Sequence, residues 1–288
     1  MKLFISLLLF LSFWEVQSQQ LSRKAMLITE ADSLFFENFK RKVATNKWET
    51  LPLQEFLIKT GTDFLNTPYV SKTLDIDTYE WLVVNFRELD CTTFVETCLA
   101  LTRTLRWGDV GLDVYCSELE KIRYRDGIKT DFTSRKHYFS EWISNNQALG
   151  IITDLTQTIG GDTLPIKLNY MSRHPQQYKQ LASNRDFLHQ ITRIERKVSS
   201  QPFFHIPKNK LPKLQQHIQS GDIIAITTTI EGLDIAHVGF ALWQNQQLFL
   251  LHASSSQKKV CISQKPLFDY LQANKTHAGI MVLRLTNQ

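Results

Sequence analysis

Residues 237–254 read HVGFALWQNQQLFLLHAS. Two apolar runs, residues 237–243 and 248–253, flank a short polar segment of glutamine and asparagine. Apolar runs on either side of a turn are typical of a β-hairpin. Any even-length loop centred on the polar segment pairs Gly239 with His252, because residues of an antiparallel pair face each other in strict register. The stretch therefore predicts two neighbouring strands of an antiparallel sheet.

The predicted register gives the two faces of this hairpin different characters. His237 and His252 become diagonal neighbours on one face, about 7–8 Å apart by Cα, so their imidazole rings can meet. Gly239 and Ala241 lie on the same face, and their small size would let the start of a helix approach closely. The other face is apolar and is expected to be core; it carries Val238, Phe240, Leu242, Phe249, Leu251 and Ala253.

Helices are expected before the sheet. Residues 222–229 and 279–286 are two further strand-like runs, so the sheet should be mostly antiparallel. Residues 30–43 have apolar side chains at helical spacing, and a second helix should open near Pro52. Helices followed by strands indicate an α+β fold. Residues 115–210 are irregular, which predicts short helices and long connections.

The composition is that of an ordinary globular protein. Of the 288 residues, 43% are hydrophobic and 21% are charged, which excludes a disordered, collagen-like or coiled-coil chain. The net charge of +5 comes from 33 basic and 28 acidic residues without a cluster of lysine or arginine. We therefore expect no nucleic-acid partner, while the oligomeric state stays open.

The N-terminus has the features of an export signal. Lys2 is followed by an apolar stretch up to Trp14, and Ser18 ends a small-residue cleavage motif. We expect residues 1–18 to be a signal peptide and residues 19–288 to be one domain in the periplasm or outside the cell. An uncleaved anchor or a buried helix are the alternatives. No other segment reaches the roughly 20 apolar residues that span a bilayer, so no membrane contact is expected after cleavage.

Cys91 is the candidate nucleophile. Residues 89–94 read LDCTTF, in which Asp90 is a typical N-cap. The thiol would lie in the first helical turn, where free backbone N–H groups and the helix dipole favour a thiolate. Cys98 would follow about 10.5 Å away on the same helix, at 1.5 Å per residue, and a disulfide needs less than roughly 7 Å. We expect Cys98 to be a core residue, whereas disulfides among Cys98, Cys116 and Cys261 stay open.

A thiol beside two imidazoles suits two kinds of chemistry. In nucleophilic catalysis Cys91 attacks a substrate, His237 is the base and His252 holds its tautomer. In a zinc site the same three side chains would bind the metal. The sequence has no C-x-x-C or H-E-x-x-H motif, so catalysis is favoured and no metal or other cofactor is expected.

Three segments carry a family resemblance. Residues 90–97, 236–240 and 252–255 together resemble the N-acetylmuramoyl-L-alanine amidase-like family within the NlpC/p60 cysteine peptidase superfamily. Residues 67–70 and 134–142 are similar as well, and so are residues 168–172, so that the likeness covers most of the mature chain.

The resemblance implies a papain-like α+β fold in which the helix of the nucleophile packs on a mostly antiparallel sheet, with a helical N-terminal half and a long middle insertion. It implies Cys91 as nucleophile, His237 as base and His252 as the third polar residue. The substrate-binding residues that we expect on this basis are Tyr69, Asp90, Arg135, His137 and Tyr138.

The implied function is an exported cell-wall amidase. It would cleave the bond between the lactyl group of N-acetylmuramic acid and L-Ala, in peptidoglycan or released muropeptides. One alternative is a γ-D-glutamyl-diamino acid endopeptidase; another is a catalytically silent protein that binds wall fragments. Peptide-cleaving relatives often have Ser-Gly after the cysteine, whereas Thr92 and Thr93 stand here, which favours the amidase.

Overall fold

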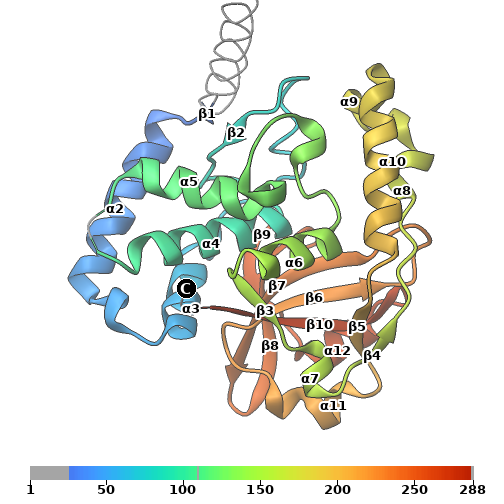
Figure 1. Cartoon of the computed structure of the whole chain (residues 1–288). Coiled ribbons are helices and arrows are strands. Elements are labelled where there is room, and N and C mark those ends of the chain that lie inside the picture. The colour runs from blue at the N-terminus through green and yellow to red at the C-terminus, as the bar shows by residue number, and fades with distance from the viewer. Residues whose placement is uncertain (1–25, 109, 287–288) are drawn as a thin grey trace, which may run out of the picture.

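The computed structural model describes residues 26–108 and 110–286, where a group of helices stands beside one large sheet (Figure 1). The predicted signal peptide at residues 1–18 therefore lies outside the described residues. In the part of the chain that is described, no helix is both long and apolar enough to cross a bilayer.

The N-terminal half is helical, as the periodicity predicts. Its helices are α2 (Glu30–Asn46), α3 (Leu53–Asp63), α4 (Cys91–Leu105) and α5 (Leu112–Arg123). Thr29 and Asp32 form a capping box that starts α2, and Pro52 is the N-cap of α3. Figure 1 shows these four helices gathered at one side of the sheet.

The middle of the chain is more regular than expected. Its helices are α6 (Phe139–Ala148), α7 (Thr156–Ile159), α8 (Tyr170–Arg173), α9 (Lys179–Ser183) and α10 (Arg185–Ser199). The prediction of short helices is wrong for α10, which has 15 residues and is capped by Asn184. Ile191 and Val198 form its narrow buried face, and the many charged residues elsewhere on this helix hide that stripe in the sequence.

The sheet is antiparallel throughout, and β10 lies near its centre. Its path runs β4-β5-β10-β6-β7-β8-β9, with β3 also paired to β10. The strands are β3 (Ile152–Asp154), β4 (Asp162–Leu164), β5 (Phe203–Pro207), β6 (Ile223–Thr228), β7 (Ile235–Gln244), β8 (Gln247–Ser254), β9 (Lys259–Ile262) and β10 (His277–Leu285). The four predicted strands are confirmed as β6, β7, β8 and β10. A separate parallel pair joins β1 (Met26–Leu27) to β2 (Leu82–Val83).

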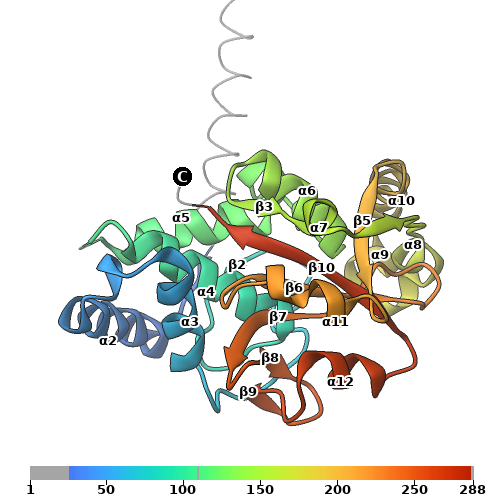
Figure 2. The same ribbon diagram turned by 90° about the horizontal axis from the view of Figure 1, so that it is seen from below.

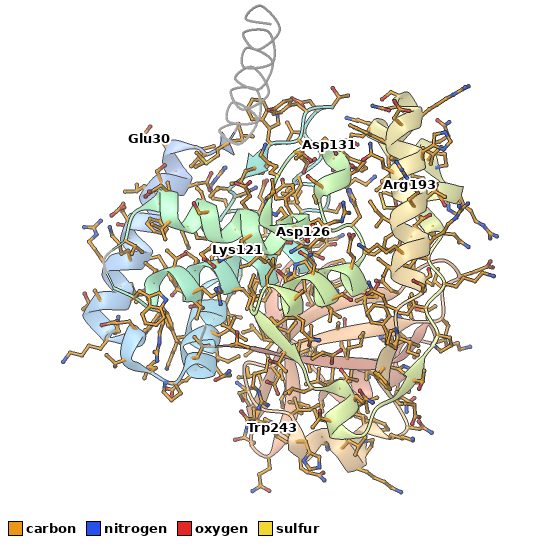
Figure 3. All side chains as sticks on the ribbon, viewed as in Figure 1. Glu30, Lys121, Asp126, Asp131, Arg193 and Trp243 are labelled. Atoms are coloured by element: carbon orange, nitrogen blue, oxygen red, sulfur yellow. The ribbon has the colours of Figure 1, made fainter. Side chains whose placement is uncertain are left out.

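A two-residue turn fixes the register of β7 and β8. Gln244 pairs with Gln247, and the two residues between them have positive φ angles of 47° and 63°, as tight hairpin turns require. This turn lies at the lower end of the molecule, beside Trp243 in Figure 3. Pairing continues in step to Phe240 and Leu251, and one residue further Gly239 stands opposite His252. The predicted register is therefore confirmed.

Both faces of the sheet are buried, but the nucleophile helix covers the face that the sequence did not suggest. The ring of Phe94 in α4 packs edge-on against Phe240, 5.5 Å away. The opposite face is covered by α11 (Leu211–Leu214) and α12 (Leu267–Gln272), the latter seen beside β8 in Figure 2. The expected approach of a helix to Gly239 is wrong: a Cβ there would lie 2.9 Å from the Cβ of His252, so the missing side chain makes room for the neighbouring strand.

Candidate active site

Cys91 is the first residue of α4, as predicted, and a capping box holds this helix start. The backbone N–H of Thr93 donates to Asp90 Oδ1 at 2.8 Å, and the N–H of Asp90 donates to Thr93 Oγ1 at 2.8 Å. Asp90, which we expected to bind substrate, is therefore engaged as the N-cap. Thr93, the second residue after Cys91, completes the capping box and therefore has a structural role.

The Cys91 thiol is neutral in this environment. It is half-buried against the core, and burial raises its pKa to about 12, with a smaller contribution from the Asp90 carboxylate. Hydrogen bonding from the backbone of Val238 in β7 opposes this shift without reversing it. Burial thus outweighs the effect of the helix start on this pKa, and a base must remove the proton.

The two predicted histidines form a pair, and His237 lines the same cleft as Cys91. His237 Nε2 and His252 Nδ1 are 2.6 Å apart, and the ring planes are nearly perpendicular at 86°. A β-bulge lies just before His237. His237 pairs with Ile226 of β6, but the next residue of β6, Thr227, pairs with Ile235, so Ile235 and His237 are separated by one residue that has no partner. Bulges redirect side chains and often lie beside active sites. Burial lowers the pKa of His237 to about 3 and that of His252 to about 4, so both rings are neutral at pH 7.

A cleft of about 180 Å³ brings several candidates together. Cys91, His137, Tyr138 and His237 all line it, whereas His252 lies behind His237 and lines a different hollow. The remaining lining residues are Thr92, Lys136, Phe139, Met171, Tyr178, Leu233, Asp234, Ile235, Ala236 and Val238. Four separate parts of the chain thus meet around the thiol: residues 91–92, 136–139, 171–178 and 233–238.

Tyr138 and His137 use much of their hydrogen-bonding capacity within the protein. The Tyr138 hydroxyl donates to Glu195 at 2.8 Å and accepts from the backbone N–H of Met171 at 2.9 Å. His137 Nε2 lies 2.7 Å from the carbonyl oxygen of Phe132, and burial lowers the pKa of His137 well below its usual range. Both side chains therefore present rigid, neutral aromatic surface to the cleft.

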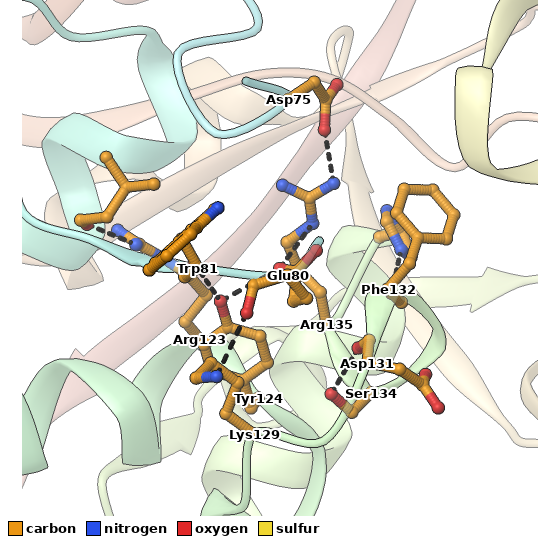
Figure 4. A network of polar contacts seen from close by, with 12 residues as sticks. Asp75, Glu80, Trp81, Arg123, Tyr124, Lys129, Asp131, Phe132, Ser134 and Arg135 are labelled. Atoms are coloured by element: carbon orange, nitrogen blue, oxygen red, sulfur yellow. Dashed lines mark hydrogen bonds and ion pairs between the residues drawn. The ribbon is translucent and has the colours of Figure 1, made fainter. Parts of the chain in front are cut away.

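Arg135 lies outside the cleft, in a buried polar network shown in Figure 4. Its Nη2 binds Asp75 at 2.5 Å, and its Nε is 3.6 Å from Glu80. Tyr124 donates to the same Glu80 carboxylate at 2.9 Å. The structure therefore does not bring Arg135 together with the other expected substrate-binding residues, because its charge is already paired inside the protein.

Two tyrosines are close enough to Cys91 to feel its charge, and the sequence indicated only one of them. Tyr69 is held by its backbone N–H, which donates to the carbonyl oxygen of Lys258 at 2.9 Å. Burial raises the pKa of Tyr69 to about 12, and the neighbouring Cys91 adds to the shift. Tyr270 in α12 packs edge-on against His252 at 5.5 Å, and Cys91 contributes to its raised pKa too.

Asp234 and Tyr178 were also missed. Asp234 is buried, and its Oδ2 accepts from the backbone N–H of Ser140 at 2.7 Å, which ties the start of α6 to the start of β7. The one sequence feature that could have indicated Asp234 is its position directly before the strand that carries His237. Tyr178 precedes α9 in the irregular middle, where no pattern distinguishes it.

The described residues, 26–108 and 110–286, include four cysteines and eight histidines. All four cysteines are free, and Cys98 is fully buried, as expected for a core residue. In the same two ranges no group of three His, Cys, Asp or Glu side chains is arranged to hold a metal ion.

Comparison with known proteins gives a consistent set of relatives. Residues 59–280 match the model of a family described as N-acetylmuramoyl-L-alanine amidase-like. The structure of an N-acetylmuramoyl-L-alanine amidase from Bacteroides uniformis ATCC 8492 is 42% identical and covers 82% of this chain and 99% of its own, with a TM-score of 0.79. A putative xylanase from Bacteroides fragilis is 39% identical and covers 79% of this chain and 99% of its own, with a TM-score of 0.76.

A more distant likeness shows the fold alone. A Legionella pneumophila protein is 22% identical, covers 89% of this chain and 95% of its own, and has a TM-score of 0.67. No significant match was found among curated proteins.

Proposed function

The chain belongs to the N-acetylmuramoyl-L-alanine amidase-like family, and we propose that it is a cysteine amidase that cleaves the bond between the lactyl group of N-acetylmuramic acid and L-Ala. The substrate would be peptidoglycan or its released muropeptides. Relatives named as amidases support a hydrolase with a peptidoglycan-related role. The observation that carries the cysteine mechanism is that Cys91 and His237 line one cleft, with His237 hydrogen-bonded to His252.

The first half of the reaction forms a thioester. His237 takes the proton from the neutral thiol while the sulfur of Cys91 attacks the lactyl carbonyl carbon. The tetrahedral intermediate then collapses: the carbon–nitrogen bond breaks, and His237 returns the proton to the departing amine of L-Ala. Backbone N–H groups at the start of α4 have no partner within the helix and would stabilise the oxyanion.

The second half consumes water. His237 removes a proton from a water molecule, which attacks the thioester carbonyl. The carbon–sulfur bond breaks, the proton on His237 returns to the sulfur of Cys91, and the lactyl carboxylic acid leaves and loses its proton to the solvent. The net change is hydrolysis of one amide bond, and no further reactant is needed.

The size of the cleft suits a small part of a large substrate. Pockets that enclose a whole small molecule are typically about 300–1,000 Å³, whereas this cleft is about 180 Å³. It would enclose the atoms around the scissile bond and leave the sugars and the rest of the peptide outside. The aromatic surface of Tyr138 and Tyr178 would line the bound segment.

Export and the wider relationship remain part of the proposal. The apolar N-terminal segment supports a periplasmic or secreted enzyme with residues 1–18 removed. A helix that carries the nucleophile at its start and packs on an antiparallel sheet supports a papain-like fold of the NlpC/p60 type.

Product analysis tests the bond that is cut. The mature chain is incubated with a disaccharide-tetrapeptide, and the products are identified by mass spectrometry, with Cys91→Ala as the inactive control. We expect a peptide that begins with L-Ala and a disaccharide without peptide. A disaccharide that retains L-Ala-D-Glu would identify the endopeptidase instead. Binding of the fragment without any product would identify a silent binding protein.

A further inference from the structure

His252 has a second polar neighbour on the side away from His237. Strand β9 places Cys261 directly opposite His252 in the ladder between β8 and β9, so the two side chains share one face. The sulfur of Cys261 lies 3.8 Å from His252 Nε2. A series of polar groups therefore leads away from the cleft: Cys91 and His237 both line it, His237 binds His252, and His252 contacts Cys261.

The direction of these hydrogen bonds decides whether His237 can act as a base. A neutral imidazole carries one proton, on either Nδ1 or Nε2. His237 Nε2 is occupied by His252, so only Nδ1 can take the proton of Cys91. His237 must then carry its own proton on Nε2 and donate it to His252 Nδ1. His252 must in turn carry its proton on Nε2, where its partner is the sulfur of Cys261.

The opposite arrangement is inactive. If His252 donated from Nδ1 to His237 Nε2, the proton of His237 would lie on Nδ1, facing the cleft, and no lone pair would be available for Cys91. Two rings bound as these are can adopt either arrangement with little difference in geometry. The partner at His252 Nε2 therefore selects between them, because an acceptor there stabilises only the active arrangement.

We infer that Cys261 is a positioning residue, which accepts the Nε2 proton of His252 and so holds His237 in the tautomer that can deprotonate Cys91. This inference rests on the proposed cysteine mechanism and adds a fourth residue to it. A thiol sulfur is a weak acceptor, and Cys261 remains a thiol because burial raises its pKa. It lines a hollow of about 180 Å³ together with His252, Ser254 and Tyr270, and this hollow shares no lining residue with the substrate cleft.

Three substitutions at this position test the inference by kinetics. Cys261→Ala removes the acceptor and should lower kcat about 10- to 100-fold with little change in KM. Cys261→Ser keeps an acceptor and should lose less. Cys261→Asp supplies a carboxylate that can only accept, so most of kcat should return, and the acid limb of the pH profile should move to higher pH because a carboxylate raises the pKa of His252. Cys116→Ala, a buried cysteine on α5 away from the site, is the matched control.

The outcomes separate positioning from packing. Wild-type kcat and pH profile in Cys261→Ala would overturn the inference. Equal loss in all three variants, in step with a lower melting temperature, would also overturn it, because it would show that only the fit of the side chain matters.

Nitrogen-15 NMR of the histidine rings tests the tautomers without substrate. We expect the proton of His252 on Nε2 in the wild-type protein and a mixture of tautomers in Cys261→Ala. A wild-type proton on Nδ1 of His252 would refute the inference even if the amidase activity is confirmed. If the wild-type enzyme forms no product from muropeptides, the proposed function fails, and the NMR result together with the rate at which iodoacetamide alkylates Cys91 still decides the role of Cys261.

Discussion

Two buried polar clusters lie close to each other in this fold, and they differ in how their charges are balanced. In the network of Figure 4, Arg135 is paired with Asp75 and Glu80. Beside it, Arg123 binds Glu96 at 2.6 Å, and both of these side chains are almost fully buried. Every charge in this network has an opposite charge next to it. At the cleft, by contrast, Cys91, His237 and His252 are all neutral groups with pKa values shifted toward the uncharged form.

The difference shows which buried polar groups do chemistry. Paired charges stabilise one arrangement of the chain, and any proton transfer would leave one of them without a partner. The thiol and the two imidazoles carry no charge before the reaction, so no ion pair has to be broken for a proton to move, and His237 lines a cleft that admits a substrate. A strongly shifted pKa alone therefore does not identify the active site; the open side does.

The largest expected effect is at the thiol. Cys91→Ala removes the nucleophile and should lower kcat by about four to six orders of magnitude, with no loss of folding. Cys98→Ala, on the same helix but fully buried, should leave kcat nearly unchanged and cost about 1 kcal/mol or more of unfolding free energy. Single-turnover kinetics and urea unfolding of both variants measure the two effects. Comparable activity in Cys91→Ala and the wild type would show that Cys91, like Cys98, has only a structural role, and would refute the mechanism.

The next effect is on stability and belongs to the paired network. Arg135→Met leaves the Asp75 and Glu80 carboxylates without their cation, which should cost about 3–5 kcal/mol of unfolding free energy. The folded fraction should keep its KM, because Arg135 does not line the cleft. Arg193→Met on the exposed face of α10 is the control and should change stability by less than about 0.5 kcal/mol. A raised KM with unchanged stability would return Arg135 to the substrate-binding residues.

The smallest effect is the pH dependence of stability. Burial lowers the pKa of His252 to about 4, so the unfolded chain binds a proton between about pH 6.5 and 4 that the folded protein does not. The free energy of unfolding must then fall as pH falls through this window, by about 1 kcal/mol for this ring between pH 7 and 5.5.

Urea unfolding at both pH values compares His252→Gln with the wild type. The variant should lose less stability on acidification; His237 and His277, whose pKa values are also lowered, remain in both proteins. His189→Gln, at an exposed position of α10, should behave as the wild type. Equal losses in all three proteins would mean that His252 is protonated as easily in the folded state as in the unfolded chain.

Much of the site follows from local patterns in the sequence. The Asp90 cap places Cys91 at the start of α4, and the parity of the turn after Gln244 brings His237 and His252 to one face. Both rules depend on residues close together in the chain. The bulge before His237 depends on β6 and could not be predicted from β7 alone.

The errors have a common physical cause. Arg135 lies two residues before His137 in the sequence, and the family resemblance suggested that both belong to one binding cluster with Tyr138. In the fold, Arg135 turns toward Asp75 and Glu80, which lie far away in the chain. Ion pairs between distant residues and the pairing of short strands such as β3 and β4 leave no periodic pattern in the sequence. Both are determined by tertiary contacts, which the sequence pattern does not show.

Strand β10 is the last strand to be synthesised, yet it lies in the middle of the sheet. On one side β10 pairs with β6, and on the other side it pairs with β5 and β3. The strands on its two sides are therefore joined into one sheet only when residues 277–285 are present. Pairing between distant segments forms slowly, because the intervening chain must first be closed into a loop. A chain emerging from the ribosome therefore stays without a complete sheet until residues 277–285 have been synthesised. If the protein is exported, as we propose, this delay would help the polypeptide to pass unfolded through a translocation channel, and the enzyme would assemble only after β10 has crossed.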